Sequence, residues 1–307
     1  MICLDEHFKE ICVKCSFPDN VTLLLFEIAS RIDLEDDFKQ KFYAIRKRHM
    51  FPTANHFDHA GEKLKELAHE KGIHEYTLNL VFLIVCSRLL LKRFIKRGYS
   101  EELFWETMQD LRYKLLECTD NSGVTGINCI NWYEGFYNFK KFFLGRFQYA
   151  QSKFACDYIT KGNMQIKENT PCLALHIPSS GVSLSDEIRF ESYKKAYDFY
   201  KNSDMIVNGN LIITCTSWLL FPKHTEFLPE KSKILSFMND FDIYSSRENV
   251  NFIDAWRIFG KCSELAYEQL PENTSLQRVY KSWLLSGNPT GRGTGVIVFD
   301  GEKIINK

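Results

Sequence analysis

The chain has no excess of charge and no apolar run long enough to cross a bilayer. Its 39 Lys and Arg residues balance 39 Asp and Glu residues, so the formal net charge is zero. No long-range field therefore favours nucleic acid or an anionic membrane, and we expect neither as a partner. The most apolar run, Leu78 to Leu91, is only about 14 residues long against the ~20 that span a bilayer, and it carries Arg88. We interpret it as a helix buried in a bundle.

The chain also shows no sign of secretion. Its first residues, Met-Ile-Cys-Leu-Asp-Glu-His, do not place a basic segment before an apolar one. The ten cysteines are scattered, and several lie in apolar runs, where a free cysteine behaves as a small hydrophobe: Cys86, Cys172 and Cys215. These features predict a cytoplasmic protein in a reducing compartment, without disulfides.

Three kinds of catalytic or metal motif are missing. Cys12 and Cys15 form a lone CxxC with no second pair, which favours two helical cysteines near one face. His56 and His59 lie one helical turn apart, but no HExxH accompanies them, so we expect no metal site, and a zinc hydrolase is the weakest alternative. Ser217 lacks the Gly-x-Ser-x-Gly elbow of a hydrolase nucleophile.

The first 120 residues show helical periodicity that caps and breakers interrupt. The breakers include Pro18, Asp33, Pro52 and Gly72, and Ser100 is positioned to cap the last helix. A polar stretch, residues 120–126, reads as a linker. The predicted helices are Asp5 to Cys15, Asn20 to Arg31, Leu34 to Arg48, Ala54 to Lys71, Glu75 to Arg97, and Glu101 to Cys118.

From Lys140 the pattern changes to short β-type runs separated by turns, with the order βββαβαβ followed by an αβ extension. The first three strands suggest an antiparallel meander. The predicted strands are Phe142 to Lys153, Ala155 to Ile166, Pro171 to Ile177, Leu211 to Ser217, Phe241 to Arg247 and Gly295 to Phe299; the predicted helices are Ser185 to Asn202, Lys231 to Asp240 and Ser275 to Ser286.

These patterns predict an α+β fold in two domains, which a chain of 307 residues accommodates comfortably. The first, residues 1–139, is all-helical. The second, residues 140–307, is a mixed β-sheet flanked by helices.

The strand Pro171 to Ile177 runs through a turn containing Gly181 into a strongly patterned helix. The N–H groups of a first helical turn have no partners within the helix, and the macrodipole adds partial positive charge there, so phosphates would bind well at this turn. An ordinary strand-to-helix connection without a ligand is about equally compatible with the pattern.

His176 and Ser217 each end a long strand, so they flank one crevice if the two strands are neighbours. His176 would place a titratable group at that edge, although a structural histidine fits as well. Gly291-Arg-Gly-Thr-Gly295 resembles a phosphate loop, but a helix precedes it and a strand follows, which favours a helix-to-strand connection. Arg292 could still reach an anion from there.

The strand and helix order is similar to the core of the GNAT-type N-acyltransferases. The chain resembles more closely a family of bacterial acyltransferases with a helical N-terminal domain and a GNAT-like C-terminal domain. The blocks that carry the resemblance are Leu144-Gly-Arg-Phe-Gln148, Leu175-His-Ile-Pro178 followed by Gly181, Cys215-Thr-Ser-Trp-Leu-Leu-Phe-Pro222, Arg257-Ile-Phe-Gly260 and Leu270-Pro-Glu-Asn-Thr-Ser-Leu-Gln-Arg278.

The resemblance implies that acyl-CoA, or acetyl-CoA, is the co-substrate and binds at the turn. The pyrophosphate loop of the GNAT family falls on residues 178–183, where only Gly181 matches its pattern and Pro178 removes a backbone donor. The expected coenzyme contacts are Ile177, Ser179, Ser180, Gly181, Val182 and Ser183.

The predicted function is transfer of an acyl group, acetyl being expected, to a small-molecule or peptide amine. His176 would act as the base and Ser217 would place a hydroxyl near the leaving thiolate. The tyrosine acid common in GNAT folds is missing from the second core helix, and Tyr244 is the nearest substitute. The alternative is a non-catalytic binding or regulatory protein that keeps the fold; the degenerate loop and the missing tyrosine favour it.

Overall fold

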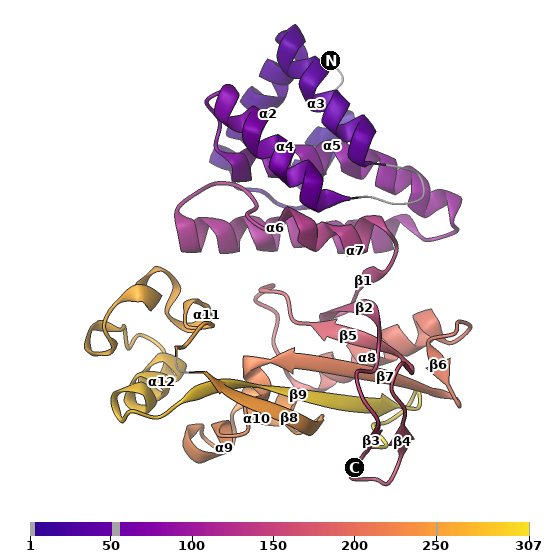
Figure 1. The fold of residues 1–307 in the computed structure, drawn as a ribbon, viewed down its shortest axis with the longest axis vertical. Coiled ribbons are helices and arrows are strands. Elements are labelled where there is room, and N and C mark those ends of the chain that lie inside the picture. Colours follow the sequence, from indigo (N-terminus) through magenta and orange to yellow (C-terminus); the bar gives the residue numbers. More distant parts are fainter. Residues whose placement is uncertain (1–3, 51–55, 250, 307) are drawn as a thin grey trace. The chain divides into compact units, whose positions relative to one another are not determined.

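A computed structural model of the chain describes residues 4–50, 56–249 and 251–306. The chain divides into two compact units, residues 1–143 and 144–307 (Figure 1). Pro52 and the predicted helix start at Ala54 lie outside the described residues. Whether the domains fold independently, with the division after residue 139 that the sequence suggests, stays a prediction.

The first unit is helical, as predicted, and its helices begin and end close to the expected residues. Asp5 caps the first helix by accepting the Phe8 N–H at 2.9 Å, and Ser100 caps α6 by accepting the Leu103 N–H at 3.2 Å. The helices are α1 (Glu6–Lys14), α2 (Asp19–Leu34), α3 (Asp36–His49), α4 (Phe57–Glu70), α5 (Glu75–Lys96), α6 (Glu101–Ser122), η1 (Ile130–Tyr133) and α7 (Glu134–Tyr137).

The apolar run from Leu78 is buried within α5, because residues 78–87 lie almost entirely inside the unit. None of the helices in the described ranges combines the length and the apolar character that crossing a membrane requires. The polar stretch expected to be a linker instead extends α6 to Ser122, and Gly123 ends the helix in the left-handed region at φ 73°.

The second unit is built on a mixed sheet of seven strands, which confirms the predicted fold class. Its order is β1-β2-β5-β7-β9-β8, and β6 pairs with β7. The β5–β7 pair is parallel, whereas β2–β5, β7–β9 and β8–β9 are antiparallel. The strands are β1 (Lys141–Leu144), β2 (Phe147–Lys153), β5 (Pro171–His176), β6 (Ile206–Val207), β7 (Asn210–Ser217), β8 (Asp242–Asn249) and β9 (Thr290–Phe299).

The expected three-stranded meander is only partly correct. β2 pairs directly with β5, and the predicted middle strand is instead a separate two-stranded sheet, β3 (Tyr158–Ile159) with β4 (Gln165–Ile166). Phe154 and Ile166 from this segment pack on Cys172, Ile212 and Val298 of the main sheet. The apolar residues that suggested a strand therefore serve to attach a hairpin; we call the sheet face that it covers the hairpin face.

Helices cover the opposite face, which we call the helix face. Tyr193 of α8 (Asp186–Tyr200) lies 5.8 Å from the Phe147 ring and 6.2 Å from the Phe299 ring. Phe237 of α10 (Lys233–Met238) also contacts Phe147, at 5.8 Å between centroids. The aromatic side chains of β2 and β9 thus hold both helices on the sheet.

The sequence favoured a helix-to-strand connection for the glycine-rich segment at residue 291. This prediction is wrong, because the segment forms the first half of β9. Its alternate glycines face the helix side, where a Cβ at Gly293 would lie 2.0 Å from the Leu220 carbonyl oxygen and one at Gly291 2.4 Å from Phe221. The glycines let η2 (Trp218–Leu220) and Phe221 lie directly on the strand, so a close approach, not a turn, requires them.

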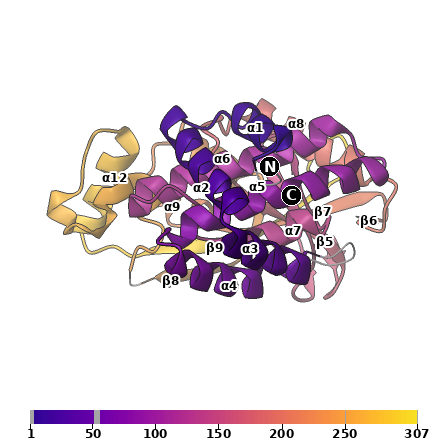
Figure 2. The ribbon, with the colours of Figure 1, turned by 90° about the horizontal axis from the view of Figure 1, so that it is seen from above.

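The remaining elements lie around the first half of β9, and α12 lies at one end of the unit in both views (Figure 1 and Figure 2). α12 begins with a capping box in which Thr274 and Gln277 each accept the other's N–H at 3.1 Å. These elements are η2 (Trp218–Leu220), α9 (His224–Phe227), α11 (Trp256–Phe259), η3 (Gly260–Glu264), η4 (Tyr267–Gln269) and α12 (Ser275–Leu285).

Candidate functional site

The central feature of the second unit is the short ladder between its two parallel strands. β5 and β7 pair over two positions, Leu173 with Ile213 and Ala174 with Thr214. Beyond them β5 continues to His176 and β7 to Ser217, outside this ladder. Ligands of open α/β sheets bind at the carboxyl ends of such strands. The sheet therefore offers a site between His176 and the end of β7.

A loop, residues 177–185, leads from β5 to α8 beside this site, and a buried arginine holds it in place. The Arg146 Nε donates to the Val182 carbonyl at 3.0 Å, and its Nη1 donates to the Pro178 carbonyl at 3.1 Å. Arg146 is only 7% exposed. Two loop carbonyls are thus occupied by one guanidinium, which fixes the course of the loop.

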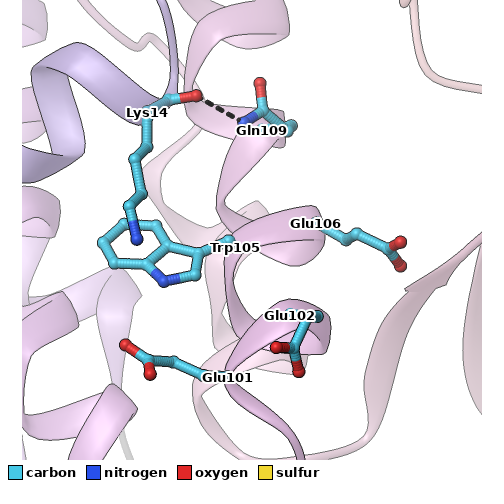
Figure 3. A pocket seen from close by; sticks show the side chains of 6 residues that line it. All are labelled: Lys14, Glu101, Glu102, Trp105, Glu106 and Gln109. Carbon is cyan, nitrogen blue, oxygen red and sulfur yellow. Dashed lines mark hydrogen bonds between the residues drawn. The ribbon is translucent and has the colours of Figure 1, made fainter.

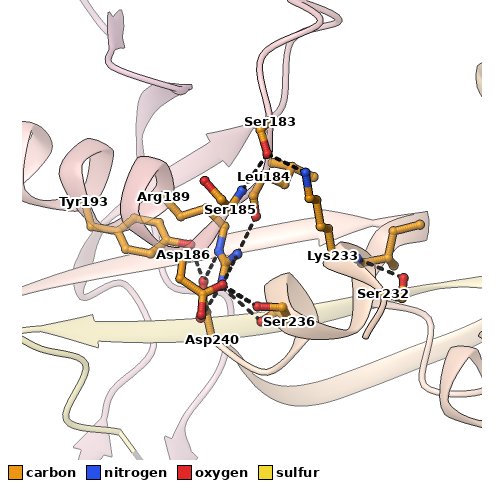
Figure 4. A network of polar contacts seen from close by, with 11 residues as sticks. Ser183, Leu184, Ser185, Asp186, Arg189, Tyr193, Ser232, Lys233, Ser236 and Asp240 are labelled. Carbon is orange, nitrogen blue, oxygen red and sulfur yellow. Dashed lines mark hydrogen bonds and ion pairs between the residues drawn. The ribbon is translucent and has the colours of Figure 1, made fainter. Parts of the chain in front are cut away.

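The loop keeps free backbone donors at the start of α8. Within the described ranges, the N–H groups of Gly181, Ser183 and Leu184 donate to no acceptor in the chain. The Lys233 ammonium of α10 donates to the Ser183 hydroxyl at 3.0 Å (Figure 4). Free N–H groups, a helix N-terminus and a cation together suit a phosphate group.

A buried ion pair ties α8 to the residues that follow α10 (Figure 4). The Arg189 Nε lies 2.6 Å from the Asp240 Oδ2, and the Nη2 lies 3.0 Å from the Oδ1. The Tyr193 hydroxyl donates to the same carboxylate at 2.9 Å, and its burial holds the tyrosine pKa well above the usual value. The bidentate geometry sets how α8, and hence the loop, sits on the sheet.

A second carboxylate at the start of α8 is neutralised locally. Asp186 accepts from the Ser236 hydroxyl at 2.6 Å and lies 3.0 Å from the Arg189 Nη1. The Ser236 hydrogen bond and the Arg189 charge both lower the Asp186 pKa. This acid therefore does not add an uncompensated negative charge to the loop.

A row of polar side chains crosses the hairpin face at the ends of β5 and β7. Gln148 lies opposite His176, Thr216 opposite Thr294, and Thr294 opposite Ser245. The Thr216 and Thr294 hydroxyls are 2.9 Å apart. Continuing the β5–β7 register brings His176 level with Thr216. Five strands thus contribute one polar side chain each to a single row. Beneath the hairpin the same face is mostly apolar, around the buried Asp242, which accepts from the Tyr158 hydroxyl at 2.9 Å.

The structure separates the three residues expected to carry the chemistry. His176 lies in the polar row and is partly exposed. Ser217 pairs with Gly293 on the helix face, and its hydroxyl caps η2 by accepting the Leu219 N–H at 3.2 Å. Tyr244 lies on β8, three strands from β5, with its ring 5.4 Å from Phe154. Burial raises the Tyr244 pKa to about 12. His176 and Tyr244 are not brought together.

The expected coenzyme contacts, by contrast, form one continuous surface. Ile177, Ser179, Ser180, Gly181, Val182 and Ser183 all belong to the loop that Arg146 holds. The Gly181 φ is 74°, and a Cβ there would meet nothing within 4 Å, so backbone conformation rather than packing requires the glycine.

Several residues of the site escaped the sequence analysis. Lys233 belongs to no motif, and Thr216 and Thr294 lie in segments that were singled out for other residues; only the sheet register and the placement of α10 bring the three to the site. Arg146 lies inside one of the blocks that carry the family resemblance, which was the single available signal for it. Among the described residues, no group of three or more His, Cys, Asp or Glu side chains is placed to hold a metal ion.

The first unit carries a pocket of its own, about 480 Å³ in volume, between α1 and α6 (Figure 3). The Lys14 ammonium lies 4.0 Å from the centre of the Trp105 ring and so occupies its face. Three carboxylates share the lining with these side chains: Glu101, Glu102 and Glu106. That charge opposes the phosphates of a coenzyme, so this pocket does not suit acyl-CoA.

Two family descriptions match the chain and together span most of it. Residues 6–138 match the N-acyltransferase N-terminal domain, and residues 142–297 match the GNAT-like C-terminal domain. A comparison with curated proteins found no match.

Solved structures share the fold over nearly the whole chain. One, an acyltransferase mutant in complex with octanoyl-CoA, is 19% identical with a TM-score of 0.72, covering 96% of this chain and 88% of that one. Another, an acyltransferase in complex with decanoyl-CoA and teicoplanin, is 18% identical with a TM-score of 0.63, covering 95% and 99%. The resemblance expected from the sequence is thereby confirmed. The chain belongs to the acyltransferase family in which an N-acyltransferase N-terminal domain precedes a GNAT-like C-terminal domain.

Proposed function

We propose that the protein transfers an acyl group from acyl-CoA to an amine acceptor. The observation that carries the proposal is the loop at residues 177–185, whose free N–H groups and neighbouring Lys233 adjoin the end of the β5–β7 ladder. The pyrophosphate of the coenzyme would accept from Gly181, Ser183 and Leu184, and the pantetheine would run between β5 and β7. Similar structures that hold octanoyl-CoA and decanoyl-CoA support acyl-CoA as the co-substrate.

His176 is the proposed base. It would take a proton from the acceptor ammonium, so that the amine nitrogen attacks the thioester carbonyl and the C–S bond then breaks. The Ser217 hydroxyl accepts from Leu219 and keeps its own proton, which it could donate toward the departing thiolate. Because Tyr244 is three strands from β5, we do not propose it as the acid.

Coenzyme binding is tested by thermal unfolding with CoA and acyl-CoA from acetyl to decanoyl. A ligand at a hundred times its Kd stabilises the native state by about 2.7 kcal/mol. Lys233→Gln should weaken this stabilisation. Lys167→Gln, which changes an exposed lysine directly after β4, should not. A flat response to every thioester would refute the proposal. The comparison of thioesters also shows whether the protein prefers the acetyl group, which the sequence analysis expected, or the longer acyl chains that the similar structures hold.

Catalysis is tested by the release of free CoA thiol from a thioester that binds. His176→Gln should keep binding and lose most turnover, because general bases contribute about 10² to 10⁴ in rate. His56→Gln, at an exposed histidine of the first unit, is the control. Turnover that survives in His176→Gln would remove this residue from the mechanism.

One observation favours a second candidate, a coenzyme-binding protein without turnover. Pro178 supplies no N–H where the GNAT pattern has a polar residue, which leaves the loop one donor short. Thermal stabilisation by acyl-CoA without thiol release, across a panel of amines, would select this candidate.

We further propose that residues 1–139 and 140–307 are separate domains of a cytoplasmic bacterial protein. The proposed location rests on the sequence, in which the cysteines are scattered and several lie in apolar runs. Limited proteolysis should cut first near residue 140 and leave two resistant fragments; a single resistant core would contradict the division.

A further inference from the structure

Two arginines face each other across the last pair of strands, next to the proposed site. Arg247 of β8 lies directly opposite Arg292 of β9, two residues beyond the pair of Ser245 and Thr294 that ends the polar row. Both side chains project from the hairpin face, since cross-strand partners share a face. Like charges directly opposite each other destabilise a sheet. Packing alone therefore gives no reason for this pair.

The acids nearby do not neutralise the pair. The Arg292 Nε lies 2.9 Å from the Asp254 Oδ2, but the Arg257 Nε lies 3.4 Å from the other oxygen of the same carboxylate. Glu248, next along β8, is paired with Lys223 at 2.8 Å. Among the described residues Arg247 makes no ion pair. Two guanidinium groups share one carboxylate and the third has none, which leaves an excess of positive charge.

The sheet order also places this charge on the side of the proposed site that lies away from the coenzyme loop. From β5, the sheet order continues through β7 and β9 to β8, so the arginines lie beyond β7 and away from the coenzyme loop. With strands about 4.8 Å apart and about 3.4 Å per residue, the Cα atoms of His176 and Arg292 are about 12 Å apart. That is roughly the span of three extended residues.

The geometry points to Arg247 and Arg292 as a carboxylate-binding subsite for a peptide-like acceptor. The acceptor amine lies at His176, its polar backbone follows Thr216, Thr294 and Ser245, and its carboxylate meets the two guanidinium groups. Arg292 is held by Asp254, whereas the exposed Arg247 is free to close on the ligand. This inference rests on the proposed function, because it assigns the acceptor of the same reaction.

The test compares triglycine with triglycinamide, which differ in the carboxylate alone, as acceptors for octanoyl-CoA. Binding is followed by NMR with CoA present, and turnover by thiol release. We expect wild type to prefer triglycine by about tenfold or more in kcat/KM, the scale of a hydrogen bond to a charged group. Arg247→Gln should abolish the preference, Arg247→Lys should retain part of it, and Lys167→Gln should leave it unchanged.

Equal binding and equal turnover of the two peptides, including the absence of both, would overturn the inference. So would a preference that survives in Arg247→Gln. If Arg247→Gln raised the KM for octanoyl-CoA alone, the arginines would bind a coenzyme phosphate, and the inference would be overturned as well. The proposed function fails separately, when octanoyl-CoA neither stabilises the wild-type protein nor releases thiol.

Discussion

The ion pair between Arg189 and Asp240 should be the most sensitive polar contact of the second unit. Arg189 is 1% exposed, and Asp240→Asn would remove the charge from a carboxylate that binds both the guanidinium and the Tyr193 hydroxyl. Removing one partner of a buried ion pair costs about 3–5 kcal/mol, because the other charge stays buried and uncompensated.

The structure favours the lower end of that range. Arg189 would keep its contacts with Asp186 and with the Ser236 hydroxyl, at 3.0 and 3.1 Å. We therefore expect Asp240→Asn to lower the free energy of unfolding by about 3 kcal/mol. For a unit of this size, about 2–4 °C per kcal/mol converts the loss into roughly 6 to 12 °C in Tm.

Urea unfolding at pH 7, followed by far-UV circular dichroism, would measure the loss. Asp186→Asn is the matched control, since that carboxylate is 73% exposed and its ion pair should contribute less than about 1 kcal/mol. The double variant Arg189→Met/Asp240→Leu should recover most of the stability, because apolar residues of similar volume replace buried pairs at little cost. A loss below about 1 kcal/mol in Asp240→Asn would refute this reasoning.

Three further predictions concern the region around β9 and α12. Gly293→Ala should lower the free energy of unfolding in urea by at least about 1–3 kcal/mol, because its Cβ would lie 2.0 Å from the Leu220 carbonyl oxygen. Thr294→Ser, on the other face of the sheet, should be nearly neutral. Equal losses in the two variants would contradict the packing argument. Burial lowers the His224 pKa from 6.5 to about 4, so the unfolded state takes up the proton first. The contribution of neutral His224 to the free energy of unfolding is complete above pH 6.5 and is lost as the pH falls toward 4; at pH 5 about 2 kcal/mol is already lost. His224→Phe should remove this part of the pH dependence of stability. The same change of stability with pH in the variant and the wild type would contradict the prediction. Thr274→Ala should cost about 1 kcal/mol by breaking the α12 capping box, whereas Ser275→Ala should change little in the same unfolding assay.

The helices could be read from the sequence because the determining contacts are local. Ser100 binds the N–H group of Leu103, and α5 is an apolar run bounded by polar ends. The end of α6 was misjudged by four residues, because a polar helical turn and a polar linker have the same composition. Only the left-handed Gly123 marks the true end.

Sheet pairing was predicted less well, because it depends on contacts distant in sequence. The glycines of β9 resembled a connection, since nothing local reveals that Leu220 and Phe221 lie against them. The residues before Ile166 resembled a strand of the main sheet, although they attach a hairpin to it.

The candidate site shows the same division. The loop after His176 was predicted because strand, glycine and helix follow one another along the chain. Thr216 and Thr294 were not, because they are 78 positions apart in sequence and become neighbours only through the β7–β9 register. Ser217 was chosen because it ends a long strand, as His176 does, but the register turns it to the other face of the sheet. Tyr244 was chosen as the tyrosine nearest the second core helix, but its strand lies three strands from β5.

The ladder between β5 and β7 pairs only two positions, so few hydrogen bonds join the two halves of the sheet that meet there. Beyond these pairs, β5 continues to His176 and β7 to Ser217 outside the ladder. A bound molecule with amides at peptide-like spacing can lie between these strand ends and act as an extra strand. Such a molecule would link the two halves of the sheet into one cooperative unit. Amide hydrogen exchange along both β5 and β7 should therefore be slower in the bound protein than in the free protein.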